Sequence, residues 1–234
     1  MTRRSIEGPF GPEDFRAATD VPRETLERLT RYADLLATWQ KRLNLVAPST
    51  IPDLWRRHML DSAQLYPLVR DSGLVGPDRP LIDLGSGAGF PGVVLAIMGV
   101  SPVVLVESDA RKCAFLREAS RLAGLTLGRV EIDSVDILRA RAENLEPRPA
   151  GVVTARALAP LGELLVLAEP FLTTDSICLF LKGQDVDAEL TEATKYWIME
   201  TEKVPSLTDR TGTILRLRGV HRVGRDDSAK SAKK

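Results

Sequence analysis

The sequence predicts an α/β protein with a mostly parallel sheet of seven strands, preceded by a helical extension. Three observations support this fold class. From about residue 76 onward, short apolar runs alternate with segments of helical pattern, which is typical of parallel sheets covered by helices on both faces. A glycine-rich loop follows the first apolar run. The first 75 residues contain only helical patterns.

The composition is that of an ordinary folded protein, with 44% hydrophobic and 27% charged residues in a chain of 234. Lys plus Arg and Asp plus Glu number 32 each, so RNA binding would require locally clustered cations. No early apolar run suits a signal peptide or a membrane span, so we expect a cytoplasmic monomer. Two cysteines, Cys113 and Cys178, predict neither a disulfide scaffold nor a zinc site, and no metal is expected.

Helical patterns fill the first 75 residues after about 20 polar residues that we expect to be loosely ordered. One helix begins near Pro22, whose fixed φ suits a first turn. The apolar residues of this helix share one face: Leu26, Leu29, Ala33, Leu36 and Leu43, with Trp39 beside them. A second helix is predicted over 54–69, closed by Pro67 and Gly73. We therefore expect residues 1–75 to form a helical extension.

Seven short apolar runs predict the strands: 80–84, 103–107, 130–132, 151–155, 177–183, 197–204 and 213–219. Helices are predicted between them over 109–124, 158–172 and 185–196. Only a short polar turn separates the last two runs, so the last strand is expected to be antiparallel. Residues 76–222 should form the α/β domain, and residues 223–234 a disordered basic tail.

Four glycines follow the first strand: Gly85, Gly87, Gly89 and Gly92. In open α/β sheets, ligands bind at this edge, and glycine lets the backbone turn tightly and approach them closely. Dinucleotides and S-adenosylmethionine both bind such loops. A G-x-G-x-x-G pattern does occur, but it starts two residues late, at Gly87. Pro91 also removes an amide that a pyrophosphate would bind at a helix N-terminus.

The other frame of the loop is Asp83-Leu84-Gly85-Ser86-Gly87-Ala88-Gly89, which resembles the first motif of Rossmann-like methyltransferases. Asp83 is expected to organise contacts to the ammonium group of S-adenosylmethionine. Glu107 ends the next strand, where a carboxylate can accept hydrogen bonds from two ribose hydroxyls. An acid there also suits a nicotinamide dinucleotide, so Glu107 does not discriminate between the two cofactors.

From residue 20 to 220 the chain is similar to the RsmG (GidB) family of bacterial 16S rRNA guanine-N7 methyltransferases. The matching segments, in family order, are LTRYADLLATWQKRLNLVAPST, WRRHMLDSAQL, LIDLGSGAGFPG, LVESDARKCAFLREASRLAGL, VVTARALAPL and LFLKG. The resemblance implies a Rossmann-like, S-adenosylmethionine-dependent methyltransferase domain over 76–222. It also implies methylation of N7 of guanine 527 in 16S rRNA, with 16S rRNA or the 30S subunit as partner.

The same resemblance implies a set of cofactor-binding residues: Gly85, Gly87, Phe90, Glu107, Ala142, Glu143 and Arg156. The segment RAENL over 141–145 resembles the family's R-x-E stretch. Counting forward from the third strand would instead put Asp136–Ile137 at the adenine. Counting back from Arg156 favours Ala142–Glu143, which we prefer.

Cations near the expected ligand edge are candidates for RNA contact. The candidates are Arg56, Arg57 and His58 in the second predicted helix, in a segment that the resemblance covers, Arg156 at the fourth strand and Lys182 at the end of the fifth. We expect His58 to meet a phosphate or the flipped base. Lys182 is the one candidate for a catalytic role, and no general base is predicted.

The chemistry of guanine N7 fits a site without a base, because this nitrogen carries no proton and has an in-plane lone pair. The N/D-P-P-Y/F tetrad of exocyclic-amine methyltransferases is missing from TARALAPL after the fourth strand. Neither cysteine follows that strand, where a C5-pyrimidine enzyme needs its nucleophile. Catalysis by positioning is therefore expected. Three alternatives stay open: a small-molecule methyltransferase, a nicotinamide-dependent oxidoreductase and a noncatalytic RNA-binding module.

Overall fold

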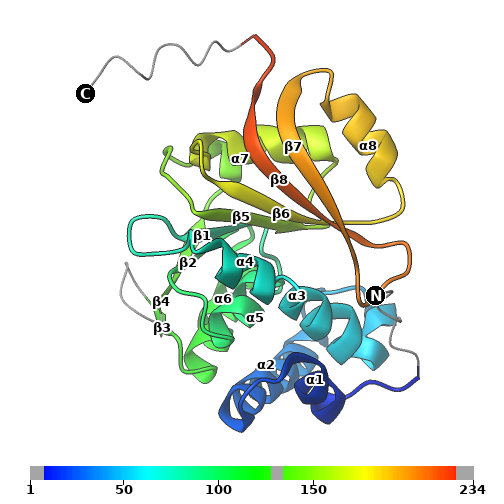
Figure 1. The fold of residues 1–234 in the computed structure, drawn as a ribbon. Helices are drawn as coiled ribbons and strands as arrows, with labels where there is room; N and C mark the ends of the chain where they lie inside the picture. Colours follow the sequence, from blue (N-terminus) through cyan, green and yellow to red (C-terminus); the bar gives the residue numbers. More distant parts are fainter. Residues whose placement is uncertain (1–7, 128–133, 225–234) are drawn as a thin grey trace.

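Eight strands form one sheet in the part of the chain that the computed structural model describes, residues 8–127 and 134–224. The strands are β1 (Leu81–Leu84), β2 (Val103–Glu107), β3 (Thr126–Leu127), β4 (Ser134–Arg139), β5 (Val152–Arg156), β6 (Ile177–Lys182), β7 (Trp197–Pro205) and β8 (Thr213–Arg222). Their order across the sheet is β3-β4-β2-β1-β5-β6-β8-β7 (Figure 1). The strands from β1 to β6 pair in parallel, whereas β8 runs antiparallel to both β6 and β7, as the sequence predicts.

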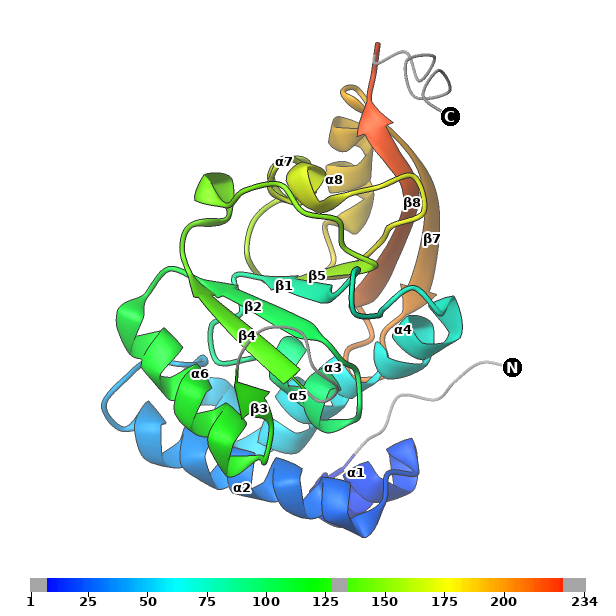
Figure 2. The same ribbon diagram turned by 90° about the vertical axis from the view of Figure 1, so that its left-hand side faces the viewer.

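Helices cover both faces of this sheet (Figure 2). The α-helices are α1 (Pro12–Thr19), α2 (Arg23–Gln40), α3 (Asp61–Ala63), α4 (Tyr66–Ser72), α5 (Gly92–Ile97), α6 (Ala110–Leu122), α7 (Leu161–Ala168) and α8 (Val186–Ala193). Short turns of other helix types are η1 (Pro48–Asp53), η2 (Trp55–Leu60), η3 (Ala142–Asn144) and η4 (Glu169–Phe171). Apolar side chains of α2, α5 and α6 pack on one face, and those of α7 and α8 on the other.

The edge of the sheet beyond β2 differs from the prediction. The strand expected over 130–132 lies outside the described residues, and β3 and β4 flank that gap. Neither β3 nor β4 was predicted, and together with the six predicted strands that the described residues contain they make eight. The sequence of β4 gives a reason. Its sequence mixes the charged residues Asp136 and Arg139 with apolar ones, and only its first two residues are fully covered. A strand near an edge needs no continuous apolar run, so this one carries no strong sequence signal.

The helical extension also departs from the prediction. The first predicted helix, α2, ends at Gln40, before Leu43, and the helix predicted over 54–69 is divided into η2, α3 and α4. Helix α1 lies in the segment expected to be loosely ordered, where the fully buried Phe15 meets the ring of Trp55 edge-on at 5.5 Å. Phe15 is the buried residue of this two-turn helix, and one buried residue leaves no periodic pattern in the sequence. Pro67 does not close the second helix, because it lies in the first turn of α4, where its missing N–H leaves no bond unmade.

The helical extension and the sheet share one apolar core. Leu29, Leu36 and Met59 from the extension belong to the same buried cluster as Val93 of α5 and Leu105 of β2. The boundary predicted at residue 75 therefore follows a change in sequence pattern and not a break in the core. This shared core fixes the extension beside the carboxyl ends of the strands.

Helix α5 lies directly on the sheet because Gly92 has no side chain. A Cβ at this position would overlap Leu105 and would lie 2.9 Å from Asp83 Oδ2. Asp83 itself is fully buried and accepts hydrogen bonds from Thr154 Oγ1 at 2.8 Å and from the Gly92 amide at 3.3 Å. These contacts join β1, β5 and the start of α5 at the loop that follows β1.

We predict that Gly92→Ala lowers the free energy of unfolding by about 1–3 kcal/mol, because the added methyl group has no room between α5 and β2. Chemical denaturation of both proteins measures the change. Gly162→Ala in α7 is the matched control: a Cβ there meets nothing within 4 Å, so its stability should change by no more than about 1 kcal/mol, in the stabilising direction. Equal stabilities for the wild type and Gly92→Ala would contradict the packing argument.

Candidate active site

A cavity of about 530 Å³ opens at the carboxyl ends of β1, β5 and β6. Its lining comes from the glycine loop after β1, from the ends of β5 and β6, from residues 45–61 of the extension, and from the turn between β7 and β8. The strand order reverses at β1, where ligands of open α/β sheets bind. The cavity is therefore the leading candidate for a ligand site.

The glycine loop forms one wall of the cavity with its backbone. Gly85 has a φ of +64°, and a Cβ there would overlap Leu158. Glu107 at the end of β2 holds the loop: its Oε2 accepts the Gly87 amide at 2.9 Å and its Oε1 accepts the Asp109 amide at 2.8 Å. Each carboxylate oxygen keeps a further lone pair for a ligand. Glu107 is 7% exposed and is not itself part of the cavity lining.

Asp83 braces the loop from inside the protein. It is completely buried and does not line the cavity. Burial raises the pKa of its carboxyl to about 6, and hydrogen bonds, with that of Thr154 the largest, oppose this rise. This position does not support the contact to a ligand ammonium group that the sequence suggested. The carboxyl serves instead to join β1 to β5 and α5.

Phe90 is the aromatic centre of the site. The ring of His58 stacks on it, with centroids 5.0 Å apart and an interplanar angle of 27°, and the Arg156 guanidinium lies 4.8 Å from its centroid. Tyr32 lies 5.5 Å away on the core side and donates its hydroxyl hydrogen to the Ala88 carbonyl. Stacking and cation–π contacts thus fix the loop, the extension and β5 against one ring.

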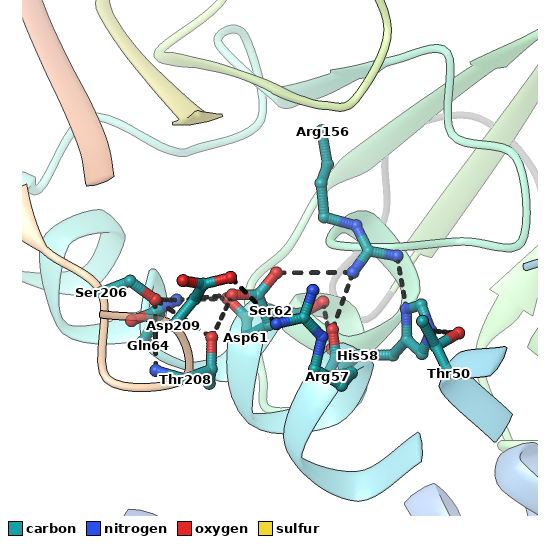
Figure 3. A network of polar contacts seen from close by, with 10 residues as sticks. All are labelled: Thr50, Arg57, His58, Asp61, Ser62, Gln64, Arg156, Ser206, Thr208 and Asp209. Carbon is teal, nitrogen blue, oxygen red and sulfur yellow. Dashed lines mark hydrogen bonds and ion pairs between the residues drawn. The ribbon is translucent and has the colours of Figure 1, made fainter. Parts of the chain in front are cut away.

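A chain of hydrogen bonds runs through His58 (Figure 3). Arg156 Nη2 lies 2.9 Å from Nδ1, and Thr50 Oγ1 lies 2.7 Å from Nε2. Because arginine only donates, Nδ1 must accept, and Nε2 therefore carries the hydrogen and donates it to Thr50. Thr50 in turn donates to the Ala47 carbonyl at 2.7 Å. Each hydrogen bond in this series therefore has a fixed donor and a fixed acceptor, so the imidazole is held as a single neutral tautomer.

The charge state of His58 agrees with this chain. Burial, and after it the positive charges of Arg156 and Arg57, lower the pKa of the imidazole to about 3. A protonated ring would direct an N–H at the guanidinium. His58 is thus a neutral ring near pH 7, and both of its nitrogens are occupied.

A second branch of the network ties the extension to the turn between β7 and β8 (Figure 3). Asp61 accepts hydrogen bonds from Thr208 Oγ1 at 2.6 Å and from Arg156 Nη1 at 3.4 Å. Arg57 Nη1 donates to Asp209 at 3.0 Å. Hydrogen bonds from Thr211 and from Arg57 lower the pKa of the Asp209 carboxyl to about 2. The extension and this turn are therefore joined by one charged pair, Arg57 with Asp209, and by the hydrogen bond from Thr208 to Asp61.

Lys182 lines the cavity at the end of β6, with a side chain that is 9% exposed. Its Nζ lies 2.6 Å from Glu189 Oε2 and donates to the Ala159 carbonyl at 3.0 Å. Glu189 of α8 also lines the cavity, and the sequence analysis missed it. Glu189 lies seven positions after Lys182 in a polar helix. Its sequence context is that of a solvent-exposed helix residue, so no sequence signal distinguishes it as part of the site.

Other predicted residues lie outside the cavity lining. Arg56 packs over the ring of Phe10 at 5.6 Å, donates to the Gly8 carbonyl and is 15% exposed, a position that does not support the predicted RNA contact. Ala142 and Glu143 follow the end of β4, beside β2.

The alternative pair, Asp136 and Ile137, lies within β4 opposite Val104 and Leu105, before the carboxyl edge of the sheet. The amide of Ala140, just after β4, donates to the Glu107 carbonyl at 3.2 Å. Ala142–Glu143 thus follows the carboxyl end of β4, whereas Asp136–Ile137 lies before it.

Three further features bear on the class of protein. Among residues 8–127 and 134–224, no group of three His, Cys, Asp or Glu side chains is arranged to hold a metal ion. No helix in these ranges is long and apolar enough to cross a membrane. Cys113 and Cys178 are buried free thiols, and burial raises the pKa of Cys178 to about 12, so neither is suited to act as a nucleophile.

Solved structures define the class of this fold. A protein from Corynebacterium glutamicum is similar with a TM-score of 0.59 over 89% of this chain and 97% of its own, at 16% identity. A ribosomal protein L11 methylase from Lactobacillus delbrueckii subsp. bulgaricus gives 0.50 over 68% and 79%, at 17% identity. The chain has the Rossmann-like fold of methyltransferases.

The family follows from sequence comparison. The model of the family rRNA small subunit methyltransferase G (GidB) matches residues 25–216. Two relatives carry the name ribosomal RNA small subunit methyltransferase G. The one from Paramagnetospirillum magneticum is 55% identical over 91% of this chain and 98% of its own, and the one from Rhodospirillum rubrum is 52% identical over 90% and 98%. The chain belongs to this family, and the protein is a methyltransferase. This confirms the resemblance drawn from the sequence.

We predict that the stability advantage of the wild type over His58→Gln shrinks as the pH falls below 6.5. The folded imidazole has its pKa at about 3, below its value of about 6.5 in the unfolded chain. The unfolded chain therefore binds the extra proton between these values, and the contribution of His58 falls by up to about 1.4 kcal/mol per pH unit.

Urea denaturation of both proteins between pH 7 and pH 4.5 measures this effect. Asp83, whose raised pKa acts in the opposite sense, is present in both proteins and cancels in the difference. A difference that stays constant over this range would contradict a buried neutral imidazole.

Proposed function

We propose that the protein transfers a methyl group from S-adenosylmethionine to N7 of guanine 527 in 16S rRNA, as a cytoplasmic monomer acting on 16S rRNA or the 30S subunit. Family membership supports an rRNA substrate. The observation that carries the proposal is a cavity at the switch point that is lined by cations and whose histidine cannot accept a proton. His58, the histidine of the lining, is neutral with both nitrogens bonded. Such a site suits a nucleophile without a proton to lose.

The residues around the glycine loop fit this cofactor. The backbone of Gly85 and Gly87 turns along the cavity and leaves room for a zwitterionic amino acid. Glu107 would hold the ribose hydroxyls with its remaining lone pairs. Ala142 and Glu143, beyond the end of β4, would contact the adenine. When bound, S-adenosylmethionine supplies a methyl group already activated by its sulfonium.

The protein's own contribution is positioning and exclusion of water. Phe90, His58 and Arg156 form one wall whose parts are fixed by stacking and hydrogen bonds. A base held against this wall would present N7 toward the glycine loop with little freedom to move, which is where much of the rate enhancement of a direct displacement arises. No residue needs to accept a proton during this step.

The RNA backbone is expected to meet the cations at the rim of the cavity. Arg57 lines the cavity and its side chain is 43% exposed, so it can exchange Asp209 for a phosphate. Lys112 of α6 lines the cavity on the side of the glycine loop. We propose these two residues as phosphate contacts in addition to Lys182.

We predict that S-adenosylhomocysteine raises the melting temperature of the protein by roughly 5–10 °C at 100 times its dissociation constant. NADH at the same concentration should leave it unchanged, because Pro91 and the late glycine frame do not suit a pyrophosphate. A thermal-shift assay with both ligands makes the comparison. Stabilisation by NADH alone would overturn the assignment of the cofactor.

We predict that the protein transfers labelled methyl groups to 30S subunits that lack this modification. Chain cleavage at N7-methylated guanine should map the label to guanine 527. Label at another position, or on an exocyclic amine, would contradict the proposed function.

Two adjacent arginines provide the matched variants for RNA binding. Arg57→Ala should lower the slope of log affinity against log salt by about 1, as the loss of one phosphate contact requires. Arg56→Ala should leave that slope unchanged, because Arg56 packs on Phe10 outside the cavity. A lower slope for Arg56→Ala and an unchanged slope for Arg57→Ala would show that Arg56, and not Arg57, contacts a phosphate.

A further inference from the structure

Three carboxylates line the cavity, those of Asp61, Glu189 and Asp209. Both oxygens of Asp61 accept hydrogen bonds, Oδ1 from Thr208 and Oδ2 from Arg156. Both oxygens of Asp209 are likewise engaged, Oδ1 by Thr211 and Oδ2 by Arg57. Among the described residues of the lining, only Glu189 Oε1 is a carboxylate oxygen with no hydrogen-bond partner.

Glu189 is held in place by its other oxygen. Oε2 accepts the Leu161 amide at the start of α7 at 2.6 Å and lies 2.6 Å from Lys182 Nζ. Its side chain is 22% exposed. With Oε2 bound to the protein, Oε1 is the oxygen left for a ligand in the cavity.

The distance between the two sides of the cavity suits a purine. β6, which carries Lys182, is two strands from β1, a spacing of about 10 Å. In guanine, the N2 amino group lies at the end of the molecule opposite N7. A guanine whose N7 faces the loop after β1 therefore directs N2 toward β6 and α8, where Glu189 lies.

The chemistry of Glu189 matches that edge of guanine. A carboxylate only accepts hydrogen bonds, and guanine presents N1–H and the N2 amino group as neighbouring donors, whereas adenine presents an acceptor at N1. Methylation at N7 leaves the base positively charged, and a carboxylate at its far edge stabilises that charge. The same carboxylate offsets the charge of Lys182, which would otherwise oppose the reaction.

We propose that Glu189 Oε1 accepts a hydrogen bond from the N2 amino group of the target guanine and so determines specificity for guanine. This inference rests on the proposed function. It adds a substrate contact on α8 to a site otherwise built from the loop, the extension and β5.

The test compares guanosine with inosine, which lacks the N2 amino group, at the target position of reconstituted 30S subunits. We expect the wild type to methylate the guanosine particle with a kcat/KM about tenfold or more above that for inosine. In Glu189→Gln the amide nitrogen takes the position of Oε1 and opposes the guanine donors, so this ratio should fall to within about threefold of unity. Affinities for the two particles, measured by equilibrium binding, give the same ratio if the variant turns over too slowly.

Glu192→Gln is the matched control, because Glu192 lies on the same helix, pairs with Lys195 and does not line the cavity. It should keep the wild-type preference for guanosine. Equal use of guanosine and inosine by the wild type, or an unchanged preference in Glu189→Gln, would overturn the inference. Failure of the wild type to methylate the guanosine particle would instead overturn the proposed function.

Discussion

The rest of the site depends on the contacts that the guanidinium of Arg156 makes. It lies over the ring of Phe90, donates to His58 Nδ1 and reaches Asp61. One side chain at the end of β5 therefore joins the glycine loop to the helical extension. Because arginine stays charged and only donates, it also dictates the tautomer of His58 and depresses its pKa. The wall of the cavity is fixed by these contacts and not by the backbone alone.

The sequence was sufficient for the fold class, the glycine loop and the antiparallel last strand, because glycine spacing and apolar alternation are local signals. It was not sufficient for β4 or α1, whose burial depends on partners far along the chain. The site was predicted in part: Phe90, His58, Arg156 and Lys182 do lie together around one cavity. Glu189 was missed because it is defined by its contact with Lys182 and not by any motif.

Charge pairing inside the cavity explains how a chain with equal numbers of acidic and basic residues can hold several cations at one site. Arg57, Arg156 and Lys182 each face a carboxylate: Asp209, Asp61 and Glu189 respectively. Pairing lowers the cost of placing these cations at partly buried positions. It also means that a phosphate must compete with a carboxylate for each cation. Polyanions that bind weakly therefore gain little affinity from this surface.

The bonds between the extension and the turn at residues 206–211 join residues that are 143 and 147 positions apart in the sequence. Gln64 accepts the Leu207 amide at 2.8 Å, and Asp61 accepts Thr208. Synthesis proceeds from the N-terminus, so the extension can make these bonds only after residues 206–211 have been synthesised. A chain that ends before residue 206 would thus contain the glycine loop but would lack the wall of the cavity that the turn between β7 and β8 supplies.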